Sequence, residues 1–190
     1  MRKLKLQVQM STDGFVAGPN GEMDWMTWNW GDDIKQHVNG LTDPVDTILL
    51  GRKMAGGFIA HWAAAVEKPD EESFAFGKKM TDTHKVVFTN TLTKSEWPNT
   101  DIATGDITDE VNKLKNQAGN DIIVYGGAGF VSSLIKAELI DEYNLFVNPS
   151  IIGNGMAIFD KIGNKQKLKL VKATPFDCGI VALQYVPQKG

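Results

Sequence analysis

Three glycines in four positions, Gly126, Gly127 and Gly129, mark the stretch with the clearest chemical potential. They follow a β-branched and aromatic run, 122–125, that is typical of a buried strand, and helical spacing of apolar residues follows them. A strand that leads through glycines into a helix places free backbone N–H groups and the positive end of the helix dipole at one point, which favours phosphate. Glycine also lets a pyrophosphate approach the backbone. A tight strand-to-helix turn without a ligand explains the run equally well.

The run departs from the usual dinucleotide-binding fingerprint. Counted from Gly127, the third glycine position holds Ser132, and no acidic residue ends the next strand, where 146–148 read Phe-Val-Asn. The run also comes late in the chain. If it binds a dinucleotide, it does so in a different fold.

A second group that could bind phosphate follows the predicted strand 45–50. There Gly51 leads into Arg52 and Lys53, and Arg is the side chain that holds phosphate with two parallel hydrogen bonds. A solvated basic start of a helix is the alternative, and these residues alone favour it.

Aromatic residues gather in the loop between 22 and 31, which holds Asp24, Trp25, Trp28 and Trp30. A loop this aromatic is either a lid packed on the core or the wall of a site for a flat ring. The loop ends at Asp32 and Asp33, which suit the first turn of a helix.

Composition narrows the class of protein. The 190 residues are 42% hydrophobic and 23% charged, which is typical of one globular domain over residues 1–190. A net charge of −3 argues against a general nucleic-acid or membrane surface. Cys178 is the only cysteine and the three histidines lack metal-ligand spacing, so we expect no metal site. The start lacks a signal peptide, and we expect a cytoplasmic protein.

The predicted elements alternate between strands and helices, which indicates an α/β fold: a mixed, mainly parallel central sheet flanked by helices, with an antiparallel hairpin at the C-terminus. Alternation in 4–10 predicts a first strand with one buried face. Residues 58–80 are expected to be polar and irregular, with a helix start at 69–72. The other expected strands are 15–17, 85–90, 101–104, 122–125, a strand that ends at 146–148, 168–174 and 179–186, and the other expected helices begin at 32 and span 108–117.

Taken together, these pieces resemble the dihydrofolate-reductase-like fold, and specifically the riboflavin-reductase C-terminal-domain (RibD C-terminal) family, as a stand-alone member. The resemblance covers nearly the whole chain, and the order and spacing of the motifs together are more specific than any single motif. The pieces are Met10-Ser11-Thr12-Asp13-Gly14, Leu50-Gly51-Arg52-Lys53, Thr89-Asn90, Tyr125-Gly126-Gly127-Ala128, Leu139-Ile140-Asp141-Glu142 and Pro149-Ser150-Ile151-Ile152-Gly153-Asn154-Gly155.

The resemblance implies an NADPH-dependent reductase of a small heterocycle, pterin-like or pyrimidine-like. It implies a pyrophosphate on the turn 126–131, an adenosine 2′-phosphate near Arg52, and a nicotinamide closed in by the Trp-rich loop. An arginine beside the 2′-phosphate is a physical reason to prefer NADPH over NADH. The implied cofactor positions are Val16, Ala17, Gly51, Arg52, Lys53, Thr89, Asn90, Gly126, Gly127, Ala128, Gly129, Phe130 and Val131.

The substrate side departs from the family pattern. Related dihydrofolate reductases carry a carboxylate at the start of the helix after the tryptophan loop, and Asp32 is the candidate catalytic residue at that place. Riboflavin-pathway reductases usually have a lysine where this chain has Gln7, which weakens the case for a ribityl-phosphate substrate. The remaining candidate substrate-binding residues are Asp13, Asp24, Trp25, Trp28 and Asp33.

Two other functions compete with the reductase. A non-catalytic NADP- or nucleotide-binding module would keep the phosphate turns without the chemistry, and the change at Gln7 motivates it. A scaffold protein would use the Trp-rich loop as a partner surface. The family resemblance also implies a homodimer, with the C-terminal strands as the candidate interface.

Overall fold

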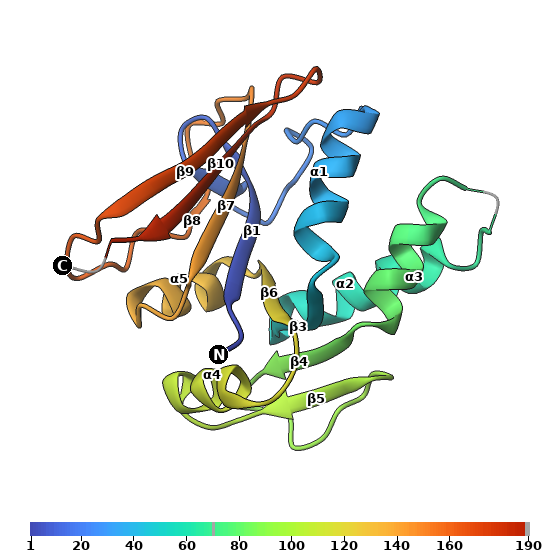
Figure 1. Ribbon diagram of the computed structural model, residues 1–190, viewed down its shortest axis with the longest axis vertical. Coiled ribbons are helices and arrows are strands. Elements are labelled where there is room, and N and C mark those ends of the chain that lie inside the picture. Colours follow the sequence, from blue (N-terminus) through green and yellow to red (C-terminus); the bar gives the residue numbers. More distant parts are fainter. Residues whose placement is uncertain (70, 189–190) are drawn as a thin grey trace.

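The computed structural model describes residues 1–69 and 71–188, and its centre is an eight-stranded sheet (Figure 1). The strand order is β5-β4-β3-β6-β1-β7-β10-β9. Neighbours from β5 to β7 are parallel, while β10 is antiparallel to both β7 and β9, so the sheet is mixed and mainly parallel as predicted. The strands are β1 (Leu4–Ser11), β3 (Val45–Gly51), β4 (His84–Phe88), β5 (Thr100–Ala103), β6 (Asp121–Gly126), β7 (Glu142–Asn148), β9 (Leu168–Pro175) and β10 (Val181–Pro187).

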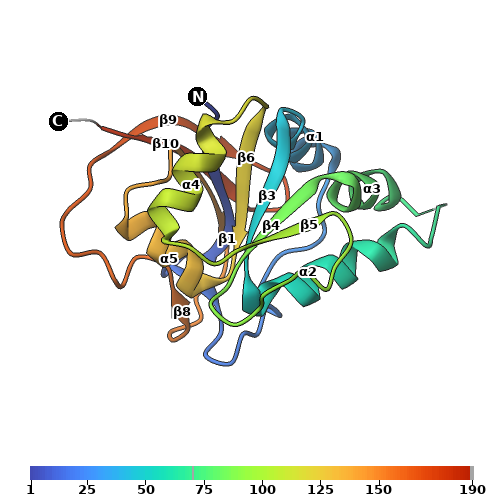
Figure 2. The same ribbon diagram turned by 90° about the horizontal axis from the view of Figure 1, so that it is seen from below.

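Helices cover both faces of the sheet (Figure 2). Each face has its own apolar core. One core contains Val111 of α4 (Ile107–Asn116) and Leu134 of α5 (Ala128–Lys136). The other contains Ile34 of α1, Ala55 of α2 and Met80 of α3, and we call this the α1–α3 face. Its helices are α1 (Asp32–Thr42), α2 (Arg52–Ala65) and α3 (Phe74–Asp82).

The central strand β1 is buried on both faces rather than on one. Leu4 and Leu6 lie in the α4–α5 core as the alternation predicted, but Lys5 and Gln7 on the other face are also buried, with 7% and 6% of their surface exposed. Lys5 Nζ lies 2.9 Å from a carboxylate oxygen of Asp121, which compensates its charge. The expectation of a solvated face was wrong because β6, β7 and the helices enclose β1 completely.

The expectation that residues 58–80 are irregular was also wrong. The first part of this segment completes α2, which continues to Ala65, and the last part is α3. The helix start expected at 69–72 is displaced, since α3 begins at Phe74, and Asp70 lies outside the described residues. The apolar side chains of α2, such as Phe58 and Trp62, are only half-buried, so they form no single buried stripe that sequence periodicity detects.

The remaining elements agree closely with the sequence. Helix α4 is capped by Asp106, whose carboxylate accepts hydrogen bonds from the backbone N–H groups of Thr108 and Asp109. Strands β9 and β10 form the C-terminal hairpin around the turn at 176–180. Two short strands, β2 (Phe15–Ala17) and β8 (Met156–Ala157), pair antiparallel beside the sheet. The sequence pattern did not predict this pairing. Within the described residues no helix is long and apolar enough to cross a bilayer.

Candidate functional site

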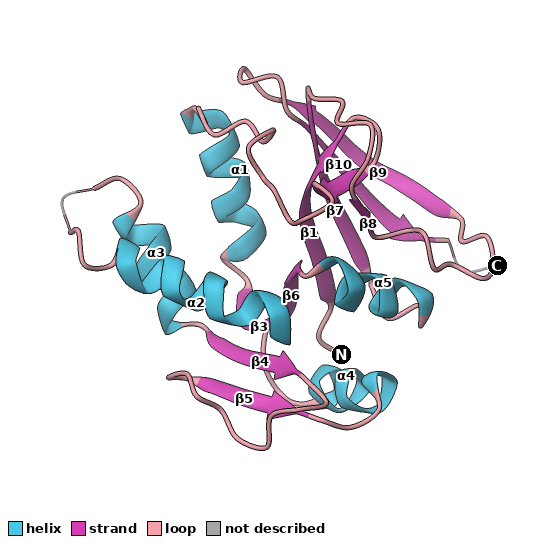
Figure 3. Ribbon diagram, turned by 180° about the vertical axis from the view of Figure 1, so that it is seen from behind, coloured by secondary structure: helices cyan, strands magenta, loops and turns pink. Residues whose placement is uncertain are grey.

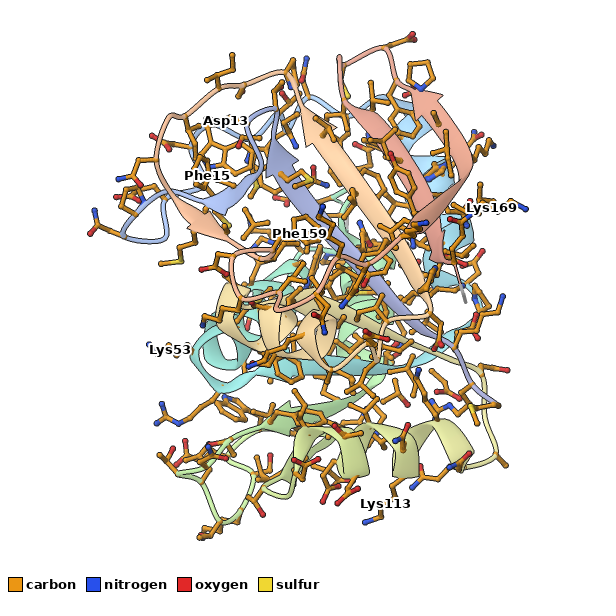
Figure 4. The ribbon with its side chains drawn as sticks, turned by 90° about the vertical axis from the view of Figure 1, so that its left-hand side faces the viewer. Asp13, Phe15, Lys53, Lys113, Phe159 and Lys169 are labelled. Carbon is orange, nitrogen blue, oxygen red and sulfur yellow. The ribbon has the colours of Figure 1, made fainter. Side chains whose placement is uncertain are left out.

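The loops that carry the candidate residues leave the sheet at one edge. The parallel strands β1, β3, β4, β6 and β7 all end there, and ligands of open α/β sheets bind outside the carboxyl ends of such strands. Asp13, Phe15 and Lys53 lie along the same side of the molecule in Figure 4 although they belong to segments far apart in the sequence. Figure 3, a view from the back of the molecule, shows the helices α2 and α5 that follow β3 and β6.

Two helix N-termini at this edge lack the usual caps. The N-cap residues are Gly51 for α2 and Gly127 for α5, so neither helix has a side-chain cap, and neither has an acidic residue in its first turn. In contrast, α1 begins with two aspartates and α4 is capped by Asp106. The first N–H groups of α2 and α5 are therefore available to an external anion, and both helix dipoles favour one.

The two uncapped turns touch each other. A Cβ added to Gly51 would lie 2.8 Å from Cβ of Phe130 and 3.5 Å from the backbone nitrogen of Gly127. The strands that lead into them, β3 and β6, are direct neighbours. The peptide bond between Gly126 and Gly127 is cis, and the Phe130 ring packs against Phe88 with 4.8 Å between centroids. Glycine at position 51 is thus what allows α2 and α5 to present their N–H groups together.

Cations and polar groups border these turns. Gly51 and Phe88 are register partners on β3 and β4, so Arg52 and Thr89 follow at neighbouring strand ends. The side chains of Arg52 and Lys53 are exposed, and neither forms an ion pair with any residue in the described part of the chain. Arg52 therefore remains able to grip an external phosphate.

The loop after β4 is shaped by its own threonine. The buried hydroxyl of Thr89 accepts hydrogen bonds from the backbone N–H groups of Thr91, at 3.1 Å, and Leu92, at 3.3 Å. Asn90 is exposed beside it. Thr89 thus holds the loop while Asn90 is free to reach a ligand.

The turn after β1 is tied to the segment that follows β7. The Asp13 carboxylate accepts hydrogen bonds from the backbone N–H groups of Gly153, at 2.7 Å, and Ile152, at 3.3 Å. A hydrogen bond from Ser11, followed by these backbone bonds, lowers the pKa of Asp13 below its ordinary value. A Cβ at Gly155 would lie 2.3 Å from the carbonyl oxygen of Ala17, so glycine is required there. The candidate nicotinamide-facing strand β2 is therefore held by the 149–157 segment.

The Trp-rich loop is anchored by one buried amide. Oδ1 of Asn148, at the end of β7, accepts a hydrogen bond from the backbone N–H of Thr27 at 2.9 Å. Its Nδ2 donates to Oε1 of Gln9 at 2.8 Å, and the carbonyl of Trp25 accepts a bond from Ser150. Asn148 itself is fully buried. The sequence offered no signal for this residue, because its partners are far away along the chain.

The tryptophans of this loop have different environments. Trp30 packs against the core of the α1–α3 face and its indole N–H donates to the carbonyl of Thr27. Trp25 is half-buried, while Trp28 is 62% exposed and stacks on Trp30 with 6.0 Å between centroids. Trp30 therefore packs on the core, as one of the two interpretations of the loop predicted, while the ring of Trp28 is largely exposed to solvent.

The three candidate carboxylates near α1 are not equivalent. Asp33 Oδ2 accepts a hydrogen bond from the backbone N–H of Asp177 at 3.0 Å, which joins α1 to the hairpin turn and lowers the pKa of Asp33. Asp32 is exposed in the first turn of α1, and Asp24 is exposed in the loop. Asp33 thus has a structural partner, which leaves Asp32 and Asp24 available for a ligand.

This edge of the sheet and its fold define a dihydrofolate-reductase-like α/β protein. The structure of dihydrofolate reductase from Enterococcus faecalis, complexed with NADP(H) and RAB-propyl, has a TM-score of 0.62 at 12% identity, covering 98% of this chain and 97% of that one. A deaminase/5-amino-6-(5-phosphoribosylamino)uracil reductase from Thermotoga maritima has a TM-score of 0.70 at 17% identity, covering 98% of this chain and 57% of that one.

The family model of the RibD C-terminal domain matches residues 2–182, and the chain belongs to that family. The uncharacterized protein YyaP of Bacillus subtilis (strain 168) is 35% identical over 188 residues, which cover 97% of this chain and 94% of that protein. The family and fold inferred from the short motifs are therefore confirmed.

Proposed function

We propose that this protein is an NADPH-dependent reductase that transfers a hydride to a small heterocycle of pterin-like or pyrimidine-like structure. The observation that carries the proposal is the contact between the uncapped N-termini of α2 and α5, bordered by the exposed side chain of Arg52. Two helix N-termini and one guanidinium are suited to a ligand with several phosphates. The names of the structural neighbours, an NADP(H) complex and a uracil reductase, support the same class.

The residues present fit the dinucleotide. The turn 126–131 and the start of α5 would hold the pyrophosphate through backbone N–H groups, as Gly127 and Gly129 leave the backbone open to it. Arg52, Lys53 and Asn90 would hold the adenosine 2′-phosphate, with Thr89 fixing the loop. Val16 and Ala17 would lie against the nicotinamide.

When bound, NADPH supplies the hydride. The chain's own tasks are to align the two rings, exclude water and provide a proton. The loop 18–31, held at Asn148, would cover the ring edge, and Asp32 is the proposed proton relay at the start of α1. A homodimer through the C-terminal strands is part of the same proposal.

Titration with NADPH and NADH, followed by tryptophan fluorescence, tests the proposal. We expect tight binding of NADPH and much weaker binding of NADH. Arg52→Ala should weaken NADPH binding at least about 10-fold, since a bidentate charge-assisted contact is lost. Arg52→Lys should recover only part of the affinity, because an ammonium cannot make the paired contact.

Lys113→Ala is the matched control, since Lys113 is an exposed cation on α4, away from Lys53 (Figure 4). Its NADPH affinity should equal that of the wild type. Failure of the wild type to bind either nucleotide would refute the proposal. Binding of NADPH without oxidation by any heterocycle would instead identify a non-catalytic nucleotide-binding module.

A further inference from the structure

Two adjacent central strands each carry a buried polar atom that has no hydrogen-bond partner within the described residues: Oε1 of Gln7 on β1 and the phenol oxygen of Tyr125 on β6. Only 6% of the Gln7 surface is exposed. An unpaired buried polar group costs free energy, so its presence requires a physical explanation. Tyr125 also departs from the regular ladder, because the register between β3 and β6 shifts between Val124 and Gly126.

The two side chains stand next to each other. Leu6 and Val124 are register partners on the parallel strands β1 and β6, and both point into the α4–α5 core. Gln7 and Tyr125 are the next residues of these strands, and successive side chains alternate between faces, so both point to the α1–α3 face. Tyr125 immediately precedes the Gly126–Gly127 turn. Gln7 and Tyr125 therefore belong to adjacent strands, and Tyr125 directly adjoins the turn of the proposed dinucleotide site.

Aromatic rings surround this position. The Tyr125 ring stacks on Phe58 of α2 with 5.5 Å between centroids and 27° between planes, and Phe58 meets Trp62 edge-on at 6.2 Å. Together with Trp30, these half-buried rings pack against the core of the α1–α3 face. Aromatic side chains favour a flat ligand, while the amide and the phenol offer polar contacts on the same face of the sheet.

The geometry points to Gln7 and Tyr125 as the specificity determinants of the substrate site, where they bind the lactam edge of an uncharged heterocycle. This inference rests on the proposed reductase function. The Gln7 carbonyl oxygen accepts a ring N–H, and the Tyr125 hydroxyl donates to the adjacent ring carbonyl oxygen. Burial raises the pKa of the Tyr125 phenol, so it stays protonated as a donor. Since neither atom is exposed to solvent, a rim side chain such as Phe58 must move aside for the ligand.

Binding of three probes distinguishes this role from a structural one. Uracil and 7,8-dihydropterin each carry a ring N–H beside a carbonyl, whereas 1,3-dimethyluracil keeps the carbonyls and lacks the N–H groups. Calorimetric titration of the full-length protein, with and without saturating NADPH, should show binding of uracil or dihydropterin. Binding of 1,3-dimethyluracil should be at least about 10-fold weaker, because it leaves Gln7 unpaired.

Gln7→Met and Tyr125→Phe keep side-chain size and remove the polar atoms. Each should weaken binding of the lactam probes about 10-fold, while the melting temperature stays equal or rises because an unpaired buried group is removed. A purely structural role predicts a lower melting temperature and unchanged probe affinity. Thr174→Val is the matched control: it removes another buried unpaired hydroxyl, on β9, and should leave probe affinity unchanged.

Each outcome decides between the two ideas. Absence of lactam binding by the wild type, equal binding of 1,3-dimethyluracil, or unchanged affinity in both variants would overturn the inference. NADPH binding is measured in parallel by fluorescence. If the wild type does not bind NADPH, the proposed reductase function itself is refuted. If the wild type oxidises NADPH and both variants keep the probe affinity of the wild type, the reductase function stands and only the roles of Gln7 and Tyr125 are refuted.

Discussion

Adjacent aspartates at the start of α1 have separable roles. Asp33 accepts a hydrogen bond from the backbone N–H of Asp177 and so fixes α1 to the hairpin, whereas Asp32 is exposed in the same turn. We expect Asp32→Asn to reduce the rate of NADPH oxidation at least about 100-fold, the lower end of a general-acid contribution, without lowering the melting temperature. Steady-state kinetics and thermal unfolding of both variants are the measurements.

Asp33→Asn is the comparison variant for Asp32→Asn. It weakens a charge-assisted hydrogen bond between elements, so the melting temperature should fall while turnover per folded molecule is kept. The reverse pattern, with Asp33→Asn inactive and Asp32→Asn active, would indicate that Asp33 is the proton relay.

Asp13 makes the anchoring of β2 dependent on pH. Its pKa is lowered by the hydrogen bond from Ser11 and by the N–H groups of Gly153 and Ile152, so the ionised carboxylate is favoured in the folded protein. A lowered folded-state pKa contributes stability above the unfolded pKa, and this is lost as pH falls through the folded value. The carboxyl resonance of Asp13 should titrate below pH 3.8, and the amide resonance of Gly153 should follow it.

NMR titration of Asp13→Asn supplies the control for that assignment. The amide of Gly153 should then lose its acidic transition while the remaining aspartates titrate as before. A midpoint for Asp13 at or above pH 3.8 in the wild type would show that the contacts to the 149–157 segment do not persist in solution.

At the scale of elements, the Trp-rich loop depends on Asn148. Replacement by alanine leaves the N–H of Thr27 and Oε1 of Gln9 without partners, which should cost roughly 2–4 kcal/mol of folding free energy. The amide of Thr27 should exchange with deuterium faster than in the wild type, and denaturant unfolding measures the free energy.

Ser150→Ala is the matched variant for the loop, because it removes only the bond to the carbonyl of Trp25. It should loosen Trp25 with a loss of about 1 kcal/mol and leave exchange at Thr27 nearly unchanged. Equal exchange at Thr27 in the wild type and in Asn148→Ala would mean that the loop is held by the packing of Trp30 instead.

The contrast between Gly127 and Asn148 shows what sequence reveals about such a site. The glycine turn is a local signal, in which strand, turn and helix follow one another, and the sequence alone predicts this geometry. Asn148 acts through Thr27, which lies 121 positions away, and no short pattern encodes that distance. Likewise the sequence pattern does not predict how far α2 extends, because the half-buried rings of this helix pack sideways against α3 and Tyr125. Such packing leaves no simple period in the sequence.

For the molecule as a whole, the alternation of strands and helices predicted a mainly parallel sheet with helices on both faces and a C-terminal hairpin, and the structure confirms it. The position of β1 at the centre was not predictable from its own residues. Lys3, Lys5 and Gln7 alternate with leucines like a half-exposed strand, yet Lys5 and Gln7 are buried because β6 and β7 enter the sheet from later parts of the chain. Of these polar residues, Gln7 is the one that the proposed substrate recognition uses.

The edge strand β9 is where the proposed homodimer would form. It ends the sheet, and its central residues are exposed, with Leu170 at 50% and Val171 at 52%. An exposed apolar edge strand offers unpaired backbone groups to a second strand, while Lys169 and Lys172 nearby restrict nonspecific pairing. We expect light scattering to give twice the chain mass of 20.9 kDa.

Leu170→Lys should shift the protein towards the monomer, because a desolvated charge at the interface is unfavourable. Lys113→Glu, an exposed change on α4, should leave the mass unaltered. The proposed cofactor turns lie at the ends of β3 and β6, away from β9 in the strand order, so a monomeric Leu170→Lys variant should still bind NADPH. A wild type that is monomeric at every concentration would exclude this interface, and β9 would then be an edge protected by its lysines alone.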